Sequence, residues 1–278
     1  MSQTDFTSQD NADYALVCSV DNARNISQLL KAIHFGETAT LCASKNGLKV
    51  TVEESKCVQA NAYIQAVLFH EYNVRQENVT FKINLNVLLE CLNIFGNSNT
   101  PGITTALKMC YGGYGSSLIL ALEEEGVLTD CHIHTQEPEN LLNFDFSTTN
   151  IISKVIMKSE VLKEVWNDLD LNSEILEITI SPNTPNLRFS TVSNLGTINL
   201  DFSKDSDMIE TFTCLKEQTN RYKISLLKPS FKALIQSAKI SIRNDDQGFL
   251  CLQYMIKVED GQTCFVEYFC APEEDTAD

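Results

Sequence analysis

The chain has 278 residues, of which 43% are hydrophobic and 21% charged, a composition typical of a globular protein and not of a fibrous or low-complexity one. Its length is sufficient for two domains of about 140 residues each. The 37 acidic and 21 basic residues give a net charge of −16, which argues against a generic nucleic-acid-binding protein because such proteins are usually basic. Any contact with DNA must therefore come from a local cluster of cations on an acidic body.

The beginning of the chain is polar and acidic and lacks the basic and apolar parts of a signal peptide. No stretch approaches the roughly 18 to 20 apolar residues of a membrane helix. We therefore expect a soluble intracellular protein without membrane contact. The ten cysteines include no C-x-x-C pair, so we expect buried free thiols in a reducing compartment, and neither a metal site nor a cofactor.

Strand patterns dominate the first half of the chain, and two helical patterns interrupt them. Apolar residues recur at i, i+3, i+4 and i+7 within 22–34 and again within 85–95, which predicts two amphipathic helices. The second of these ends at Gly96. The EEEG at 123–126 predicts a hairpin turn. Strands are expected at 14–20, 38–44, 47–53, 60–69, 79–85, 105–112, 118–122 and 127–135.

A polar stretch with Pro138 begins a connector at 136–150, after which the plan repeats. Helices are expected at 161–169 and 229–238, the second with a proline in its first turn, where the missing N–H costs nothing. Strands are expected at 151–158, 175–181, 186–192, 197–202, 209–215, 221–226, 240–243, 249–258 and 263–270. We expect residues 1–13 and the acidic tail 272–278 to be disordered.

The two halves match each other in order and in one local motif. KINL at 82–85 leads into the second helix, and KISL at 223–226 leads into the fourth, 141 residues later. Four short helices on a chain rich in strands cannot form alternating βαβ units. The sequence therefore predicts an α+β fold with antiparallel sheets that carry helices on one face, as a pseudo-repeat of domains 14–135 and 151–271.

Several long segments, spread over both predicted domains, resemble one family. They are LKAIHF at 30–35, NGLKVTVEESKCVQANAYIQ at 46–65, TQEPE at 135–139, RYKISLLKPS at 221–230, GFLCLQYMI at 248–256 and CFVEY at 264–268. Together they cover the chain from about 14 to 272 and resemble the Rad-one family, one subunit of the heterotrimeric DNA-damage checkpoint clamp (the nine-one-one complex).

The resemblance implies the two-domain sliding-clamp fold, with sheets outside and four helices lining the lumen of a ring. It implies a nuclear, non-catalytic subunit that joins two other clamp-fold subunits around double-stranded DNA, independently of sequence. A clamp loader would place the ring at damage sites, where checkpoint and repair proteins would dock. Composition and periodicity imply none of this.

Given that fold, cations on the polar helix faces become candidates for contact with DNA phosphates. At 100° per residue, Arg24 and Lys31 lie within about 20° of each other, and Lys228, Lys232 and Lys239 lie within about 40°. The candidates that face the lumen are Arg24, Lys31, Lys163, Lys228, Lys232 and Lys239. The simpler interpretation is a set of solvated helix faces. Because the second helix carries no cation, we expect the partner subunits to supply more of the positive charge.

Ring closure in this fold pairs an edge strand of one subunit with an edge strand of the next, a form of β-augmentation. The matching segments are 127–135 and 197–202, and the alternative is that both are ordinary solvated edges. The candidate interface residues are Val127, Thr129, Cys131, Ile133, Thr197, Ile198, Asn199 and Leu200.

Client peptides of clamps usually dock beside the connector, which here carries Leu141, Leu142, Phe144 and Phe146. If these side chains are exposed they form a docking surface. The alternative, that they pack back on the domain, is equally compatible with the sequence.

Two other function classes stay open. A metal-dependent 3′–5′ DNA exonuclease needs three or four carboxylates converging on ions about 4 Å apart. The acidic candidates are Asp145, Asp168, Asp170, Asp245 and Asp246, but none forms a D-x-E or H-x-D set. His132 and His134 share a strand face without a third ligand. A protein-interaction scaffold without DNA contact would keep the edges and the connector and leave the cations unused.

Overall fold

The structure, a computed structural model, describes residues 13–96, 103–144, 146, 150–194, 196–259 and 261–273. Most of the segments expected to be disordered, 1–12 and 274–278, and Asp145 lie outside this range. The chain divides into two compact units. The first contains the residues up to 52 and 62–140, and the second contains 53–61 and the residues from 141 onward.

The described part of the first unit contains two sheets and two α-helices, α1 (Ala23–Ala32) and α2 (Leu85–Leu92). One sheet is antiparallel, with strand order β5-β1-β7-β8-β9, and in the other the order runs β10-β6-β2-β3-β4. The strands are β1 (Leu16–Val20), β2 (Thr38–Ser44), β3 (Gly47–Glu54), β4 (Val58–Gln65), β5 (Glu71–Val74), β6 (Asn78–Asn84), β7 (Ala106–Tyr111), β8 (Leu118–Glu124), β9 (Val127–Ile133) and β10 (Thr135–Gln136). The tip of the β3–β4 hairpin, residues 53–61, belongs to the second unit.

The second unit has strand orders β15-β11-β17-β18-β19 and β14-β13-β12-β16, with antiparallel pairing throughout. Its helical segments are α3 (Ser159–Asp168), α4 (Ile224–Leu227), the 3-10 turn η3 (Lys228–Ser230) and α5 (Phe231–Gln236). Its strands are β11 (Ile151–Lys158), β12 (Ile175–Ile180), β13 (Leu187–Ser193), β14 (Gly196–Phe202), β15 (Ile209–Cys214), β16 (Gln218–Lys223), β17 (Ser237–Asp245), β18 (Leu250–Lys257) and β19 (Thr263–Cys270). The α+β class with antiparallel sheets is confirmed.

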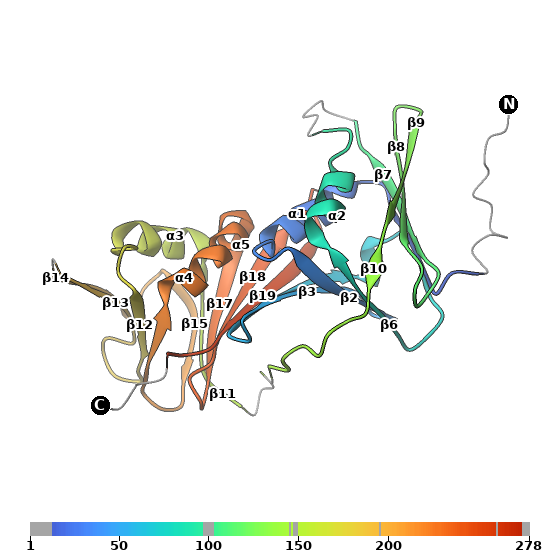
Figure 1. Cartoon of the computed structure of the whole chain (residues 1–278). Helices are drawn as coiled ribbons and strands as arrows, with labels where there is room; N and C mark the ends of the chain where they lie inside the picture. The colour runs from blue at the N-terminus through green and yellow to red at the C-terminus, as the bar shows by residue number, and fades with distance from the viewer. Residues whose placement is uncertain are drawn as a thin grey trace, which may run out of the picture. The chain divides into compact units, whose positions relative to one another are not determined.

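The helices form because each has an apolar stripe to bury and a polar cap at its start. In α1, Ile26, Leu29 and Leu30 are buried, and the Asn22 side chain accepts a hydrogen bond from the Arg24 N–H at 3.0 Å. In α2 the Asn84 side chain accepts one from the Val87 N–H at 3.1 Å. Figure 1 shows α1 beside α2 in the first unit and α3 beside α5 in the second.

Most predicted strands are present, and β2, β11 and β19 have the predicted bounds. The predicted hairpin turn joins β8 to β9, with Glu125 and Gly126 both at positive φ. The strand expected at 60–69 ends at Gln65, where the 3-10 turn η2 (Ala66–Leu68) begins. Strand β5 was not predicted because four half-exposed residues carry too little alternation. Among the described residues no helix is long and apolar enough to span a membrane.

The fourth predicted helix is wrong at both ends. The helical run begins at Ile224, because Ile224 and Leu227 are buried three positions apart, and it ends at Gln236. Lys239 therefore lies on strand β17 and not on a helix with Lys228 and Lys232. Ile240 and Ile242 are buried with a period of two, and pairing with β11 and β18 outweighs the helical pattern there.

All ten cysteines are described, and all are free. Five of them are buried, and the other five are partly exposed, so the expectation of buried thiols holds for half of the set. For one buried thiol, Cys18, burial first and the neighbouring Cys110 and Glu71 next raise the pKa far above its usual range. Buried thiols of this kind act as small apolar side chains and are poor nucleophiles.

Candidate functional site

The first predicted interface strand, β9, is an outer strand of its sheet. It pairs with β8 over seven residues, and in the sheet order no strand follows it. Ile133 is buried, Cys131 and Thr129 are partly exposed, and Val127 is 56% exposed, so the strand opens to solvent toward its hairpin. β9 thus offers an unpaired edge with an apolar end.

The second predicted interface strand, β14, is also an outer strand. It pairs with β13 over seven residues and ends the order of the four-stranded sheet. On its solvent side Asp201 accepts two hydrogen bonds from Arg188, from Nε at 2.6 Å and from Nη2 at 2.8 Å. These bonds hold the pKa of Asp201 below its usual range. Asp201 therefore stays negatively charged.

Both strands lack the side chains with which proteins usually protect sheet edges. Lysine and proline on an outer strand discourage pairing with other chains. β9 has the sequence VLTDCHI and β14 has GTINLDF, so neither contains Lys, Arg or Pro. By contrast, β16, at the other end of the β14 sheet, carries Arg221 and Lys223. Two seven-residue edges without this protection are suited to pairing with another chain.

The cations on α1 lie on its half-buried polar face, where α2 approaches. Lys31 Nζ donates a hydrogen bond to Asn93 Oδ1 at 3.2 Å. His34 and Asn86 form a second link at 2.6 Å. Arg24 is partly exposed on the same helix. These contacts fix the orientation of α1 against α2 and leave Lys31 already engaged with a polar partner.

The cations of the second unit differ in their surroundings. Lys228 and Lys232 are exposed and lie four residues apart along the helical run of η3 and α5. Lys163 on α3 lies 4.0 Å from Glu160. Lys239, which the sequence placed on the same stripe, instead donates a hydrogen bond to Glu210 on β15 at 2.7 Å. The structure therefore brings Lys228 and Lys232 together and separates Lys239 from them.

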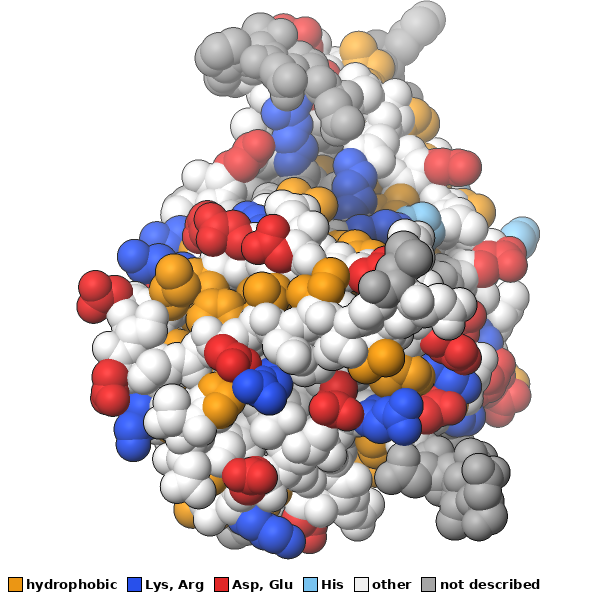
Figure 2. Space-filling view, turned by 90° about the vertical axis from the view of Figure 1, so that its left-hand side faces the viewer, with side chains coloured by type: hydrophobic (Ala, Val, Ile, Leu, Met, Phe, Trp, Pro, Cys, Tyr) orange, Lys and Arg blue, Asp and Glu red, His pale blue; other side chains and the backbone are white. Residues whose placement is uncertain are grey.

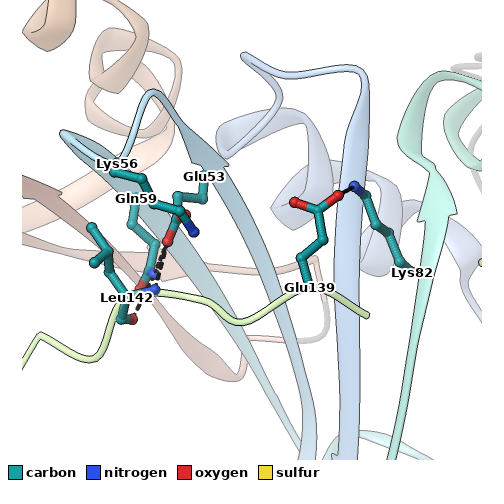
Figure 3. Close-up of polar contacts among 6 residues, drawn as sticks. All are labelled: Glu53, Lys56, Gln59, Lys82, Glu139 and Leu142. Carbon is teal, nitrogen blue, oxygen red and sulfur yellow. Dashed lines mark hydrogen bonds and ion pairs between the residues drawn. The ribbon is translucent and has the colours of Figure 1, made fainter. Parts of the chain in front are cut away.

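The connector is held at Leu142 by the tip of the β3–β4 hairpin (Figure 3). Glu53 accepts hydrogen bonds from the Leu142 N–H at 2.8 Å and from Gln59 Nε2 at 3.0 Å, and it pairs with Lys56 at 2.6 Å. Gln59 Nε2 also donates to the Leu142 carbonyl at 2.9 Å. Burial raises the pKa of Glu53, but the bonds from Lys56, Leu142 and Gln59 outweigh it and hold the pKa below its usual range.

On the other side of Leu142, two connector phenylalanines pack on the second unit. The Phe144 ring stacks on Phe269 at 5.1 Å and meets Phe249 edge-on at 5.6 Å, while Phe146 lies 5.3 Å from Phe269. Both remain partly exposed, and they line a pocket of about 420 Å³ together with Lys56 and Asp246, among others. Leu142 is 37% exposed and Leu141 is partly exposed.

In the first unit the connector is held by Glu139, which pairs with Lys82 of β6 (Figure 3). Neither these contacts nor those of Glu53 and Gln59 were predicted from the sequence. Glu53 lies 89 residues from Leu142, and no local pattern near Glu53 signals a partner at that distance.

Two of the acidic candidates for an exonuclease, Asp170 and Asp245, stabilise local turns. Asp245 accepts hydrogen bonds from the N–H groups of Gln247 and Phe249, at 3.0 and 2.8 Å, and so closes the β17–β18 hairpin. Asp170 likewise accepts from the Asn172 N–H at 3.0 Å. Within the described ranges no group of three or more His, Cys, Asp or Glu side chains could hold a metal ion. His132 and His134 are both exposed.

Comparison with known proteins identifies the family. A family model described as repair protein Rad1/Rec1/Rad17 matches residues 15–256. The chain is 61% identical over 268 residues to cell cycle checkpoint protein RAD1 of Homo sapiens, covering 96% of this chain and 95% of the human protein. It is 58% identical over 272 residues to the protein of the same name from Mus musculus, covering 98% and 97%.

A more distant relative carries a different name. DNA repair exonuclease REC1 of Mycosarcoma maydis is 23% identical over 328 residues, covering 78% of this chain and 71% of that protein. The family match over most of the chain and the two relatives near 60% identity decide the assignment. The chain belongs to the Rad1 family.

Proposed function

We propose that this chain is a non-catalytic subunit of a heterotrimeric ring that encircles double-stranded DNA at damage sites in the nucleus. In this role it pairs with two other clamp-fold subunits, is loaded by a clamp loader and serves as a platform for checkpoint and repair proteins. The names of the relatives near 60% identity support the checkpoint role.

The observation that carries the proposal is a strand order that repeats from one unit to the other. The order β5-β1-β7-β8-β9 corresponds to β15-β11-β17-β18-β19, and β6-β2-β3-β4 corresponds to β16-β12-β13-β14. Strands β1 to β9 each have a counterpart ten positions later, and the two-residue strand β10 has none. The helices follow the same rule, since α1 and α3 follow the first strand of each set and α2 and the α4–α5 run follow the sixth. This supports two similar clamp domains.

The repeat also indicates how the ring closes. Within the second unit, residues 58–61 of β4 neighbour β19. The counterpart of β4 is β14 and the counterpart of β19 is β9, and both β14 and β9 are outer strands without Lys, Arg or Pro. We infer that β9 of one subunit pairs with β14 of the next, or with its equivalent, in the way that β19 pairs with β4.

The helical cations support a lumen that attracts DNA weakly and without sequence preference. Arg24, Lys31, Lys228 and Lys232 are placed on helices, whereas Lys163 is close to Glu160 and Lys239 is paired with Glu210 on a strand. Phosphate contacts of this kind carry no sequence information and suit a sliding ring. On a chain of net charge −16, the partner subunits must supply more of the positive charge.

The connector supports the platform role. Its two phenylalanines pack on the domain, and the pocket of about 420 Å³ beside them remains available to an apolar client side chain. Both interpretations of the connector therefore apply in part: the phenylalanines pack back, and Leu142 stays exposed.

Because one distant relative is named an exonuclease, nuclease activity is an alternative worth testing. Purified chain should release no nucleotides from a labelled duplex in the presence of Mg²⁺ or Mn²⁺. Release that is abolished by Asp245→Asn but not by Lys228→Glu would favour the nuclease.

The experiment that tests the ring is the mass of the purified chain in solution, alone and mixed with the two other subunits of the checkpoint clamp. We expect a monomer alone and a one-to-one-to-one complex in the mixture. A stable homotrimer would retain the clamp fold and reject the heterotrimer. A chain that stays monomeric in the mixture would favour a protein-interaction scaffold that does not contact DNA.

A further inference from the structure

Two partly exposed cysteines meet where helix α2 packs on the outer strand β9. Cys91 belongs to the last turn of α2, and Cys131 lies on β9. Both thiols are free, and their side chains form a hydrogen bond with each other. The packing of α2 on β9 thus brings together two oxidisable sulfur atoms from separate elements of the chain.

The alternation of side chains along β9 explains why Cys131 points toward the helix. Cys131 shares one side of the strand with buried Ile133, whereas Asp130 and His132 point to the other side and are exposed. Its partner across the β8–β9 ladder, Leu120, is fully buried. Cys131 therefore lies at the border between the core and solvent, where a small oxidant can reach it.

A second pair of cysteines in the same unit shows what this arrangement adds. Cys18 and Cys110 lie on the paired strands β1 and β7, but Cys18 is opposite Met109, the residue before Cys110. Because successive side chains of a strand point to opposite faces, the two thiols lie on opposite faces of the sheet. Both are also buried. Cys91 and Cys131, by contrast, combine mutual contact with access from solvent.

The two sulfur atoms hold their protons unequally. Burial first, then the hydrogen bond and charge of Cys131, and last Glu90 raise the pKa of Cys91 to about 11. A hydrogen bond that raises a pKa stabilises the protonated form, so the Cys91 thiol is the donor. Because the thiolate is the nucleophile, Cys131 is the sulfur that attacks an oxidant first, and Cys91 is the thiol that resolves the product.

We propose that Cys91 and Cys131 form a redox-sensitive dithiol, which hydrogen peroxide converts into a disulfide that fastens β9 to α2. The Cys131 sulfur attacks one peroxide oxygen, the O–O bond breaks, and the products are a sulfenic acid and one water molecule. The Cys91 sulfur then attacks the sulfenic sulfur, and its proton leaves with the displaced hydroxide as a second water molecule. The two thiols lose two electrons in total, and the peroxide gains them.

The disulfide acts on a strand that is held on one side only. Within the described chain β9 pairs with β8, and at its hairpin end Val127 is 56% exposed. A covalent bond to α2 restrains the strand and makes its separation from β8 less frequent. This property belongs to the single chain and does not depend on the proposed ring.

The test exposes the purified full chain, fully reduced and then freed of reductant, to a small excess of hydrogen peroxide. The remaining thiols are alkylated, and intact mass with peptide mapping locates each oxidised cysteine. The variants are Cys91→Ser and Cys131→Ser. Their matched control is Cys42→Ser, which removes another partly exposed thiol of the same unit, on β2. Hydrogen exchange measured by mass spectrometry compares β9 in the reduced and oxidised chains.

We expect a reversible disulfide between Cys91 and Cys131 in the unchanged chain and in Cys42→Ser. Cys91→Ser should accumulate a sulfenic acid at Cys131, whereas in Cys131→Ser the remaining Cys91 should oxidise about tenfold more slowly. Exchange of the β9 amides should slow by about tenfold on oxidation.

Three results would overturn the proposal. Peroxide could oxidise Cys42 as fast as the pair, which would make the reaction unselective. The cross-link could form only after the chain is unfolded in denaturant, which would mean that the folded chain keeps the two sulfur atoms apart. The disulfide could also form without slowing exchange in β9, and it would then fasten nothing.

Discussion

Two of the outer strands, β9 and β14, are built alike but differ in how their helix-facing sides are covered. On the helix-facing side of β9, exposure rises from buried Ile133 through Cys131 and Thr129 to Val127, which is 56% exposed. On the same side of β14, none of the residues Ile198, Leu200 and Phe202 is buried. Helix α2 closes most of the first edge, whereas α3 leaves a groove along the second.

In the proposed ring, this difference would let one chain distinguish two neighbours. The β9 edge offers backbone groups for strand pairing and an apolar end, and its surface has little shape beyond that of the strand itself. The β14 edge adds a pocket of about 410 Å³ between this strand and α3, with Glu164 and Asp168 at its border, so a partner in the proposed ring would have to match both shape and charge. Figure 2 faces the side of the molecule that carries α3 and β14, and apolar side chains form a band there with acidic side chains along its border. A ring of unlike subunits needs such a distinction at every junction, because equal edges would permit the subunits to join in more than one order.

The largest effect is expected from a change at the apolar end of β9. Val127→Lys removes an apolar contact and adds an ammonium group that is partly desolvated when the neighbour docks, and together these cost on the order of 3 kcal/mol. Binding to the subunit that joins at β9 should weaken on the order of 100-fold. The measurement is a titration of each partner subunit against the variant, with binding at β14 unchanged.

The control for this change is Val67→Lys. Val67 has the same side chain and is 71% exposed, on the turn η2 and on neither outer strand. It should leave both affinities as they are. An equal loss with Val67→Lys would mean that added charge, and not the β9 edge, weakens assembly.

The next effect is expected away from both edges, at the exposed helical cations. Lys228→Glu with Lys232→Glu should lower retention of the assembled ring on circular DNA by about tenfold at low salt, because lost phosphate contacts reduce both affinity and its salt dependence. Assembly of the ring should be intact, since neither residue lies on an outer strand. Retention of the ring on DNA is measured after a salt wash.

The matched control is Lys239→Gln. Lys239 was predicted to share the stripe but lies on β17, where it pairs with Glu210. Retention on DNA should stay near that of the unchanged chain. If Lys239→Gln releases DNA as readily as the double variant does, the assignment of the lumen face is incorrect.

Much of this architecture could be predicted from local patterns. Strands β2, β11 and β19 alternate apolar residues over their whole length, and α1 combines an apolar stripe with a polar cap at Asn22. Both outer strands could be placed on the edges of their sheets through the family resemblance. Periodicity alone identifies a strand but not its neighbours.

What could not be predicted depends on contacts distant in the sequence. The residues around Lys239 fit a helical stripe and a strand equally well until the ladders with β11 and β18 decide for the strand. The groove beside β14 is formed by side chains of α3 and β14 together, which no local spacing encodes. The hydrogen bond from the Leu142 N–H to Glu53 joins residues 89 positions apart.

A smaller effect is expected from a change that makes the β14 edge more negative. Arg188→Gln removes the bidentate partner of Asp201 and leaves its carboxylate unneutralised on the solvent side of β14. Binding of a neighbour with a basic edge at this strand should therefore strengthen by about twofold at low salt, while binding at β9 stays the same. The two affinities are measured by the same titrations. Weaker binding at β14 would indicate that Arg188 itself contacts the neighbour.

The smallest effect is expected from a change at the connector, which lies on neither outer strand. This change tests whether binding at β9 and β14 is independent of the connector. Glu53→Gln keeps an acceptor for the Leu142 N–H but removes the charge that pairs with Lys56. The free energy of unfolding should fall by about 1 kcal/mol, and hydrogen exchange at the Leu142 amide should accelerate. Both edge affinities should remain unchanged.

The pH dependence of the unfolding free energy tests the direction of this effect. Because the folded pKa of Glu53 lies below the ordinary glutamate value of about 4.3, its charge stabilises the fold fully above that value. The stabilisation is lost as pH falls through the lower folded pKa. The difference in unfolding free energy between the chain and Glu53→Gln should thus be constant from about pH 6 to 8 and shrink below about pH 4. A difference that grows on acidification would mean that Glu53 is held protonated, and that the connector is fastened by another contact.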